Sequence, residues 1–162
     1  MRRLRRHATV LTLYHGTNHE ALQGILTTGI KAPAHLTQDL TTALYYAGDL
    51  DRDEPGIVLT VEVASEELLS TFLSTDIDTS QLDWEATGGS TPDTSLQHIV
   101  IAPKGVPAAQ IIQLSFYNML LTEEPLLTCT PIEYLSDSTN IWQQVCELDI
   151  DVTTKYLGDV ST

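Results

Sequence analysis

Two short stretches of the sequence hold the residue types best suited to chemistry: His15-Gly16-Thr17 and Tyr45-Tyr46. The apolar residues before the first stretch favour an extended chain, and the glycine interrupts it, which predicts a strand that runs into a turn. Thr41 or Thr42 can cap a short helix that ends with the two tyrosines. An imidazole, a glycine backbone open to close approach and a tyrosine face suit a flat heteroaromatic ligand with a carboxamide and a ribose.

The composition indicates one globular domain. The chain has 162 residues, of which 42% are hydrophobic and 19% charged, enough for a single hydrophobic core. Cys129 and Cys146 lack the spacing of a metal site, so we expect buried, reduced thiols rather than a disulfide framework. His19, His35 and His98 have no partner at metal-binding spacing, and we therefore expect no metal.

Basic residues are concentrated at the start of the chain. Arg2, Arg3, Arg5 and Arg6 are half of the eight, so the remainder has four bases against 22 acids and a net charge near −18. Such a body repels phosphate backbones, which argues against general nucleic-acid binding; it fits a basic partner or simply a solvated surface. Without a secretion signal or a run of about 20 apolar residues, we expect a cytoplasmic protein that does not enter the membrane.

The remaining pattern alternates helices and strands. Residues 18–29 have the apolar spacing of an amphipathic helix, with Thr17 or Asn18 as its cap and Gly29 as a left-handed stop. Residues 56–63 alternate between two faces and form the clearest strand. Further elements are expected as strands at 34–37, 96–102 and 109–117, a helical turn at 65–69 capped by Ser65, and a covering helix at 139–148. This mixture predicts an α+β fold with two small packed β-sheets and flanking helices.

Several of these segments, in this order, resemble a known family. The segments are Tyr14-His15-Gly16-Thr17, a helix with Gly29, His35-Leu36-Thr37, Ala43-x-x-Tyr46-Ala47, and the strand at 56–63. They resemble the NAD-dependent ADP-ribosyltransferases of the diphtheria-toxin and poly-ADP-ribose-polymerase type. The resemblance implies an ADP-ribosyltransferase-like domain at 10–117, between a basic arm at 1–9 and an extension at 118–162 packed on the same domain.

The resemblance implies NAD as the cosubstrate, with transfer of ADP-ribose to a macromolecular acceptor and release of nicotinamide. His15 would bond a ribose hydroxyl as a donor, Gly16 would present its backbone to the nicotinamide amide, and Tyr46 would stack on the nicotinamide ring. The remaining cofactor-binding residues would be Thr17, Leu36, Thr37 and Tyr45. Tyr45 also competes for the stacking role, for which the Ala-x-x-Tyr-Ala frame favours Tyr46.

The third catalytic position departs from the family. Where a glutamate usually opens a strand, this chain has Gln97. Departure of nicotinamide gives the ribose oxocarbenium character, which a carboxylate bonded to the neighbouring hydroxyl stabilises, whereas glutamine offers an acceptor oxygen without the charge. Three interpretations follow: slow transfer to an acceptor that is already a good nucleophile, replacement of the lost carboxylate by Glu85 or Asp93 from the polar segment 74–93, or loss of catalysis with binding retained.

Two other functions compete with the transferase. An acidic protein without turnover could occupy a basic or nucleic-acid-binding site of a partner, and it would not need an open cleft lined by His15, Gly16 and Tyr46. An RNA phosphotransferase ranks last, because the body has only four bases with which to hold RNA phosphates. We therefore expect a protein acceptor or a basic partner rather than nucleic acid.

Overall fold

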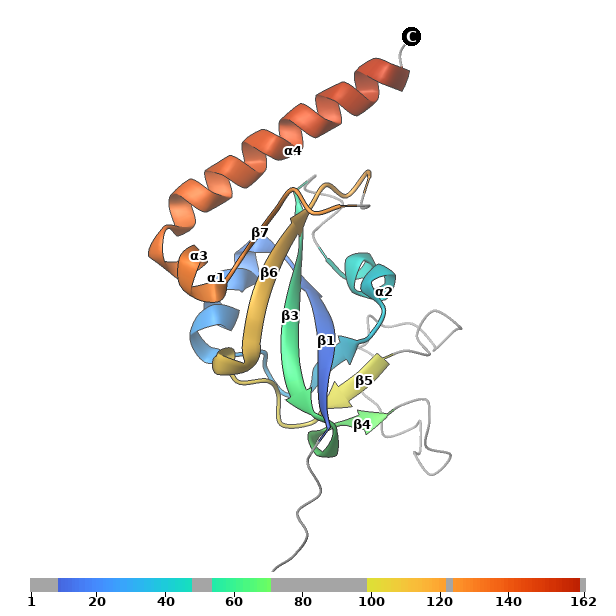
Figure 1. The fold of residues 1–162 in the computed structure, drawn as a ribbon, viewed down its shortest axis with the longest axis vertical. Helices are drawn as coiled ribbons and strands as arrows, with labels where there is room; N and C mark the ends of the chain where they lie inside the picture. Colours follow the sequence, from blue (N-terminus) through green and yellow to red (C-terminus); the bar gives the residue numbers. More distant parts are fainter. Residues whose placement is uncertain (1–8, 48–53, 71–98, 122–123, 161–162) are drawn as a thin grey trace, which may run out of the picture.

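A computed structural model describes residues 9–47, 54–70, 99–121 and 124–160 (Figure 1). The strands are β1 (Val10–Thr17), β2 (Ala34–Thr37), β3 (Gly56–Ala64), β4 (Leu69–Ser70), β5 (Ile99–Ala102), β6 (Ile111–Tyr117) and β7 (Leu127–Cys129). The α-helices are α1 (His19–Thr28), α2 (Leu40–Tyr45), α3 (Pro131–Ser136) and α4 (Ser138–Val160), with short 3-10 turns at Ser65–Glu67 and Ala108–Gln110. Within the described ranges, no helix is both long and apolar enough to cross a lipid bilayer.

All seven strands belong to one antiparallel sheet with the order β4-β5-β2-β1-β3-β6-β7. The predicted mixture of helices and strands is confirmed, but the prediction of two sheets is wrong. The one sheet is nevertheless weakly connected between β1 and β2, because β1 pairs with β3 along its whole length and with β2 only at Tyr14↔Thr37. In Figure 1, β4 and β5 lie at a steep angle to the upright β1, β3 and β6. The sheet therefore has two halves that share one paired position.

Strand β3 lies near the centre of the sheet and is covered on both faces. Its predicted alternation is confirmed: Ile57, Leu59, Val61 and Val63 belong to the main core, with α1, whereas Val58 packs with α2 in a second cluster. Each of these five side chains is at most 1% exposed. The burial of apolar side chains on both faces holds α1 and α2 on either side of the sheet.

The C-terminal helices pack against the sheet through aromatic rings and one buried amide. Phe116 is fully buried, and its ring centroid lies 5.9 Å from that of Tyr134 and 6.1 Å from that of Trp142. The Asn118 side-chain amide donates to Asp149 Oδ1 and to Thr153 Oγ1, each at 2.8 Å. These contacts hold α4 against the sheet as far as Thr153, whereas its C-terminal end extends past the sheet (Figure 1).

Local sequence signals gave the bounds of α1 correctly. Asn18 Oδ1 accepts a hydrogen bond from the Ala21 amide at 2.9 Å, as expected of an N-cap. Gly29 follows the helix with a φ of 93°, a region that favours glycine. The strand predicted at 34–37 is confirmed as β2. In this part of the chain, capping residues therefore mark the ends of the helix.

Two predictions next to the candidate site are wrong. His15-Gly16-Thr17 is not a turn, because these residues pair with Leu59, Val58 and Ile57 and continue β1 to its end. Helix α2 is not capped by Thr41 or Thr42. Asp39 is its N-cap, and Asp39 Oδ2 accepts from the Thr42 amide at 3.2 Å and from the Thr42 hydroxyl at 2.6 Å.

Other boundaries also differ from the expectation. The turn after β3 is a 3-10 turn without a side-chain cap at Ser65, β6 begins at Ile111, and α4 continues to residue 160 instead of ending at 148. Of the predicted strand at 96–102, the described part is β5. The segment 74–93, with Glu85 and Asp93, lies outside the described residues, as does Gln97. Cys129 and Cys146 are free; Cys129 is buried, and burial raises its thiol pKa to about 11.

Candidate functional site

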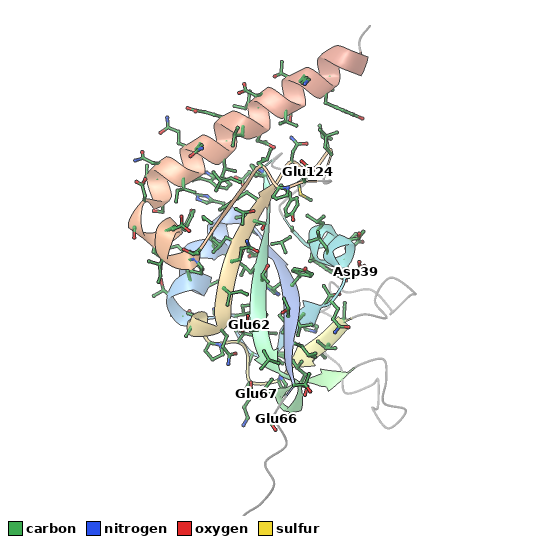
Figure 2. The ribbon with its side chains drawn as sticks, viewed as in Figure 1. Asp39, Glu62, Glu66, Glu67 and Glu124 are labelled. Carbon is green, nitrogen blue, oxygen red and sulfur yellow. The ribbon has the colours of Figure 1, made fainter. Side chains whose placement is uncertain are left out.

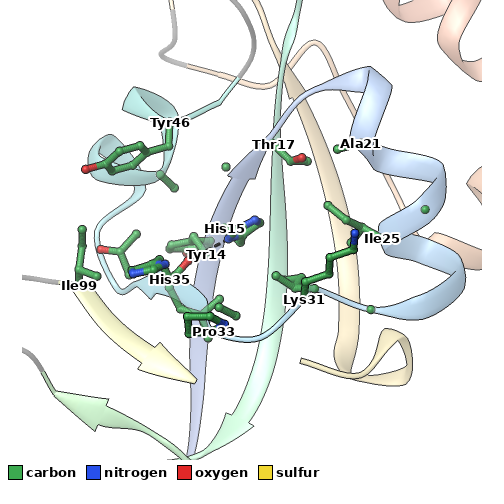
Figure 3. Close-up of a pocket in the computed structure, with 18 of the residues that line it drawn as sticks. Tyr14, His15, Thr17, Ala21, Ile25, Lys31, Pro33, His35, Tyr46 and Ile99 are labelled. Carbon is green, nitrogen blue, oxygen red and sulfur yellow. Dashed lines mark hydrogen bonds between the residues drawn. The ribbon is translucent and has the colours of Figure 1, made fainter. Parts of the chain in front are cut away.

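A cavity of about 650 Å³ lies where β1 and β2 part. Figure 3 shows residues of α1 on one side of it, Tyr46 at the end of α2 on the other, and His15 of β1 between them. Ligand pockets typically measure about 300–1,000 Å³. The cavity brings together six of the predicted site residues: His15, Gly16, Thr17, Leu36, Thr37 and Tyr46.

His15 is held in place by the neighbouring strand. Its Nδ1 atom lies 2.8 Å from the backbone carbonyl oxygen of His35 on β2. A carbonyl oxygen can only accept, so Nδ1 carries the hydrogen and donates it. The link lies next to the single β1–β2 pairing at Tyr14 and Thr37. The orientation of the imidazole therefore depends on the junction between the two halves of the sheet.

The same environment keeps the His15 ring neutral. Burial lowers the pKa of His15 from its ordinary value of 6.5, and the charge of His35 lowers it further, against the hydrogen bond to the His35 carbonyl, which raises it. Burial is the largest of these effects, because it disfavours the charged form. In a neutral ring with its hydrogen on Nδ1, the Nε2 atom keeps its lone pair. His15 thus offers a hydrogen-bond acceptor, rather than the donor expected from the sequence.

Gly16 allows α2 to approach β1 closely. A Cβ atom at this position would collide with the carbonyl oxygen of Ala43 and would stand 2.8 Å from the amide nitrogen of Ala47. Any side chain here must displace the last turn of α2 and, with it, Tyr46. The glycine therefore serves packing, and its backbone also lines the cavity.

The two tyrosines at the end of α2 have different surroundings. Tyr46, the C-cap residue, lines the cavity, whereas Tyr45 does not and is 79% exposed. Their rings meet edge to face with centroids 5.0 Å apart. Of the two tyrosines considered from the sequence, only Tyr46 therefore lies in the cavity lining with His15 and Gly16.

Thr37 connects β2 to the start of α2. Its hydroxyl oxygen accepts from the Asp39 amide at 3.0 Å, and Asp39 in turn caps α2. Thr37 is 3% exposed and lines the cavity beside Leu36. This short chain of hydrogen bonds sets where α2 begins, and hence where Tyr46 lies at its C-terminal end.

The cavity also contains residues that sequence reasoning missed. Lys31 is the only lysine or arginine among the described residues that line it, and Glu20 the only carboxylate. Figure 3 shows Lys31 on the α1 side, close to Ile25. The signal that could have found Lys31 was its rarity, as one of four bases outside the arm, two residues after the helix stop at Gly29. Ile99, the first residue of β5, lines the cavity two positions after Gln97.

Comparison with known proteins adds no identity to this geometry. The sequence matches no protein-family model, and no curated protein was found to be similar to it. In the described part of the chain, no group of three or more histidine, cysteine, aspartate or glutamate residues could hold a metal ion.

Proposed function

We propose that the protein is an NAD-dependent ADP-ribosyltransferase that transfers ADP-ribose from NAD to a macromolecular acceptor. The observation that carries the proposal is the single cavity lined together by His15, Gly16 and Tyr46. Tyr46 lies 30 positions after Gly16 in the sequence, and only the fold brings it to one site with His15 and Gly16. The residues resemble the NAD-binding set of ADP-ribosyltransferases, and the cavity supports their common role.

The nicotinamide would bind at the α2 end of the cavity. Tyr46 offers an aromatic face, and the nicotinamide ring of NAD is flat and positively charged, so stacking gains both dispersion and cation–π attraction. The Gly16 backbone lies at the same end, packed against the turn that carries Tyr46. A backbone without a side chain can approach the carboxamide closely.

His15 would orient the nicotinamide ribose by accepting a hydrogen bond. Because Nδ1 donates to the His35 carbonyl, the free Nε2 of the neutral ring can accept from a ribose hydroxyl. This reverses the direction expected from the sequence, in which the imidazole donates. The lowered pKa of His15 supports the proposal, since a protonated ring would have no lone pair to offer.

Lys31 would face the diphosphate of NAD. It brings the one lysine or arginine charge into the described lining of the cavity, on the side opposite Tyr46. NAD is an elongated molecule whose two phosphates lie between its two ribosides. A cation on the α1 side, with Tyr46 on the α2 side, matches this order of charge and aromatic ring.

The reaction would break the bond between the ribose carbon and the nicotinamide nitrogen. Nicotinamide leaves as a neutral molecule with the bonding electron pair, and the acceptor's nucleophilic atom bonds to the ribose carbon and loses its proton. Gln97 can bond the neighbouring hydroxyl as a neutral acceptor, which stabilises the cationic transition state less than a carboxylate does. We therefore expect slow turnover unless another carboxylate contributes.

The alternative is an acidic binding or inhibitor protein on the same fold. Net charge and Gln97 favour this function. A pure mimic of an acidic ligand has no need of a cavity, yet one is present and lined by the three predicted residues. For this reason the transferase is the function that the geometry supports best.

The deciding experiment supplies the purified protein with NAD labelled in the adenylate phosphate, alone and with cell lysate. Nicotinamide release or label on a macromolecule should occur in the unaltered protein and disappear in His15→Ala and Tyr46→Ala. Tyr45→Phe is the matched control and should keep full activity, because Tyr45 is exposed outside the cavity and phenylalanine keeps the edge-to-face contact with Tyr46. Failure of calorimetry to detect NAD binding would refute the proposal, whereas NAD binding without turnover would indicate a binding module that has lost catalysis.

Gln97→Glu tests the chemical argument separately. Restoring the charge should raise the rate of nicotinamide release by a factor on the order of 10², the usual effect of one preorganised polar contact in a transition state. The control is Gln97→Ala, which removes the acceptor oxygen and should lower the rate. Equal rates for glutamine and glutamate would show that Gln97 is not the third catalytic residue.

A further inference from the structure

Large apolar side chains near the C-terminal end of α4 are exposed. Val145 in the first half of the helix is fully buried, and Trp142 is half-buried against Phe116. Beyond them, Ile150 is 63% exposed and Leu157 is 55% exposed. These two residues are seven positions apart and so lie on one side of the helix.

Two more exposed leucines are connected to the helix through the Asn118 side chain. Leu120 and Leu121 are 53% and 39% exposed, and their amides donate to Asn118 Oδ1 at 3.0 and 3.2 Å. The other end of the Asn118 amide donates to Asp149 and Thr153 of α4. One buried side chain thus ties the leucine turn to the helix, and we call the combined set the α4 surface: Leu120, Leu121, Ile150, Tyr156 and Leu157.

Exposed acidic residues lie close to Ile150 in the helix. Glu147 and Asp151 are exposed on α4, three positions before and one position after Ile150. Figure 2 shows Glu124 at the same end of the molecule as α4. Lys155 is the only base in the helix. The surface therefore combines apolar side chains with a surplus of negative charge.

The end of the helix is largely exposed to solvent over residues 154–158. Residues 154–158 are all exposed, Gly158 lies in the helical segment, and the last turn has no basic residue to interact with the helix dipole. Helix ends with so little tertiary packing open easily. An apolar partner laid along Ile150 and Leu157 would supply the missing contacts.

We propose that the α4 surface binds a basic amphipathic helix of a partner protein. Apolar side chains of the partner would cover Ile150, Leu157 and the two leucines, and its lysines and arginines would face Glu147 and Asp151. Charge decides the occupant: a second copy would bring acid against acid, and an anionic lipid surface or nucleic acid would be repelled. This inference does not depend on NAD binding.

The first test uses a fluorescein-labelled peptide of about 18 leucine and lysine residues, arranged to place all leucines on one helix face. Its anisotropy should rise on addition of the full chain, while a scrambled peptide of the same composition should bind at least about tenfold more weakly. Ile150→Ser combined with Leu157→Ser should weaken binding by about tenfold or more. Ile132→Ser on α3 is the matched control, because Ile132 is 78% exposed away from the surface, and it should change nothing.

Two further readouts separate the possible occupants. Glu147→Gln combined with Asp151→Asn should weaken peptide binding and reduce its dependence on salt, and hydrogen exchange at residues 154–158 should slow in the complex. Equal binding of the scrambled peptide, no effect of the Ile150 and Leu157 variant, or no binding at all would overturn the proposal. Sedimentation showing a dimer that dissociates in that variant would overturn it too, by assigning the surface to a second copy.

Discussion

At the scale of single residues, His15 shows how the fold selects one form of a side chain. The same imidazole could donate or accept at either nitrogen, and the choice is made by the carbonyl of His35 at 2.8 Å. No sequence pattern contains this information, because it depends on how β2 lies beside β1. The sequence was enough to select His15 as a candidate site residue, but it did not show which ring nitrogen carries the hydrogen.

The first prediction concerns the pH dependence of NAD binding. The folded pKa of His15 is below 6.5, so the ring is neutral at pH 7 and keeps its acceptor. NAD affinity should therefore be constant above pH 6.5 and fall once the pH passes below the lowered pKa, as Nε2 gains a proton. Calorimetry between pH 4.5 and 8 measures this. His19→Gln is the control for the other histidine of lowered pKa and should leave the profile unchanged.

The same shift has a consequence for folding stability. The unfolded chain binds a proton at His15 near pH 6.5, before the folded chain does. The free energy of unfolding should therefore decrease as the pH falls from 6.5 towards the lowered pKa, and this contribution should be complete above 6.5. Urea titrations of the unaltered protein and His15→Gln should diverge over that range; parallel curves would show that His15 is not buried neutral.

At the scale of elements, the close contact of β1 and α2 depends on Gly16. Gly16→Ala should lower the free energy of unfolding by about 1–3 kcal/mol, because the new methyl group collides with the Ala43 carbonyl. Gly24→Ala in α1 is the matched control: its Cβ meets nothing within 4 Å, so it should raise stability by about 0.5–1 kcal/mol. Chemical denaturation measures both, and equal effects would contradict the packing role of Gly16.

Asn118 connects α4 to the segment that follows β6. Asn118→Asp has nearly the same shape and keeps an oxygen for the Leu120 and Leu121 amides, but it replaces the donor to Asp149 and Thr153 by a second negative charge. We expect a loss of about 1–3 kcal/mol, with faster hydrogen exchange in α4 after residue 149 and little change in β3. Uniform acceleration across both elements would show that α4 opens only with the whole domain.

Sequence reasoning succeeded for elements with local signals. Helix α1 has a capping asparagine and a terminating glycine, and β3 has strict alternation, so both were predictable. It failed where distant segments decide the outcome. Gly16 is a chain breaker by type, yet pairing with Val58 keeps it in a strand, and the Asp39 cap overrides two threonines. The one-sheet topology depends on pairings between remote strands, which alternation alone does not encode.

At the scale of the whole molecule, the C-terminal helices complete the core. Tyr134 and Trp142 cover Phe116, so a chain ending at residue 117 would expose a large apolar area. Such a truncation should be insoluble or molten, whereas a chain ending at residue 153 should keep its melting temperature within about 3 °C, because residues 154–158 are all exposed. Circular dichroism measures both; a cooperative transition in the shorter chain would show that residues 10–117 fold alone.

The junction at Tyr14 and Thr37 has a mechanical consequence. The lining of the cavity includes residues of β1 and of β2, which belong to different halves of the sheet, and these two strands are joined by one ladder position and by the hydrogen bond from His15 to His35. So short a connection can bend while the long β1–β3 ladder stays intact. The width of the cavity is then set by the single β1–β2 pairing rather than by the stiffness of the whole sheet. A bulky ligand would then disrupt the pairing of Tyr14 with Thr37 first, and a covalent cross-link between β1 and β2 at this position would fix the width of the cavity.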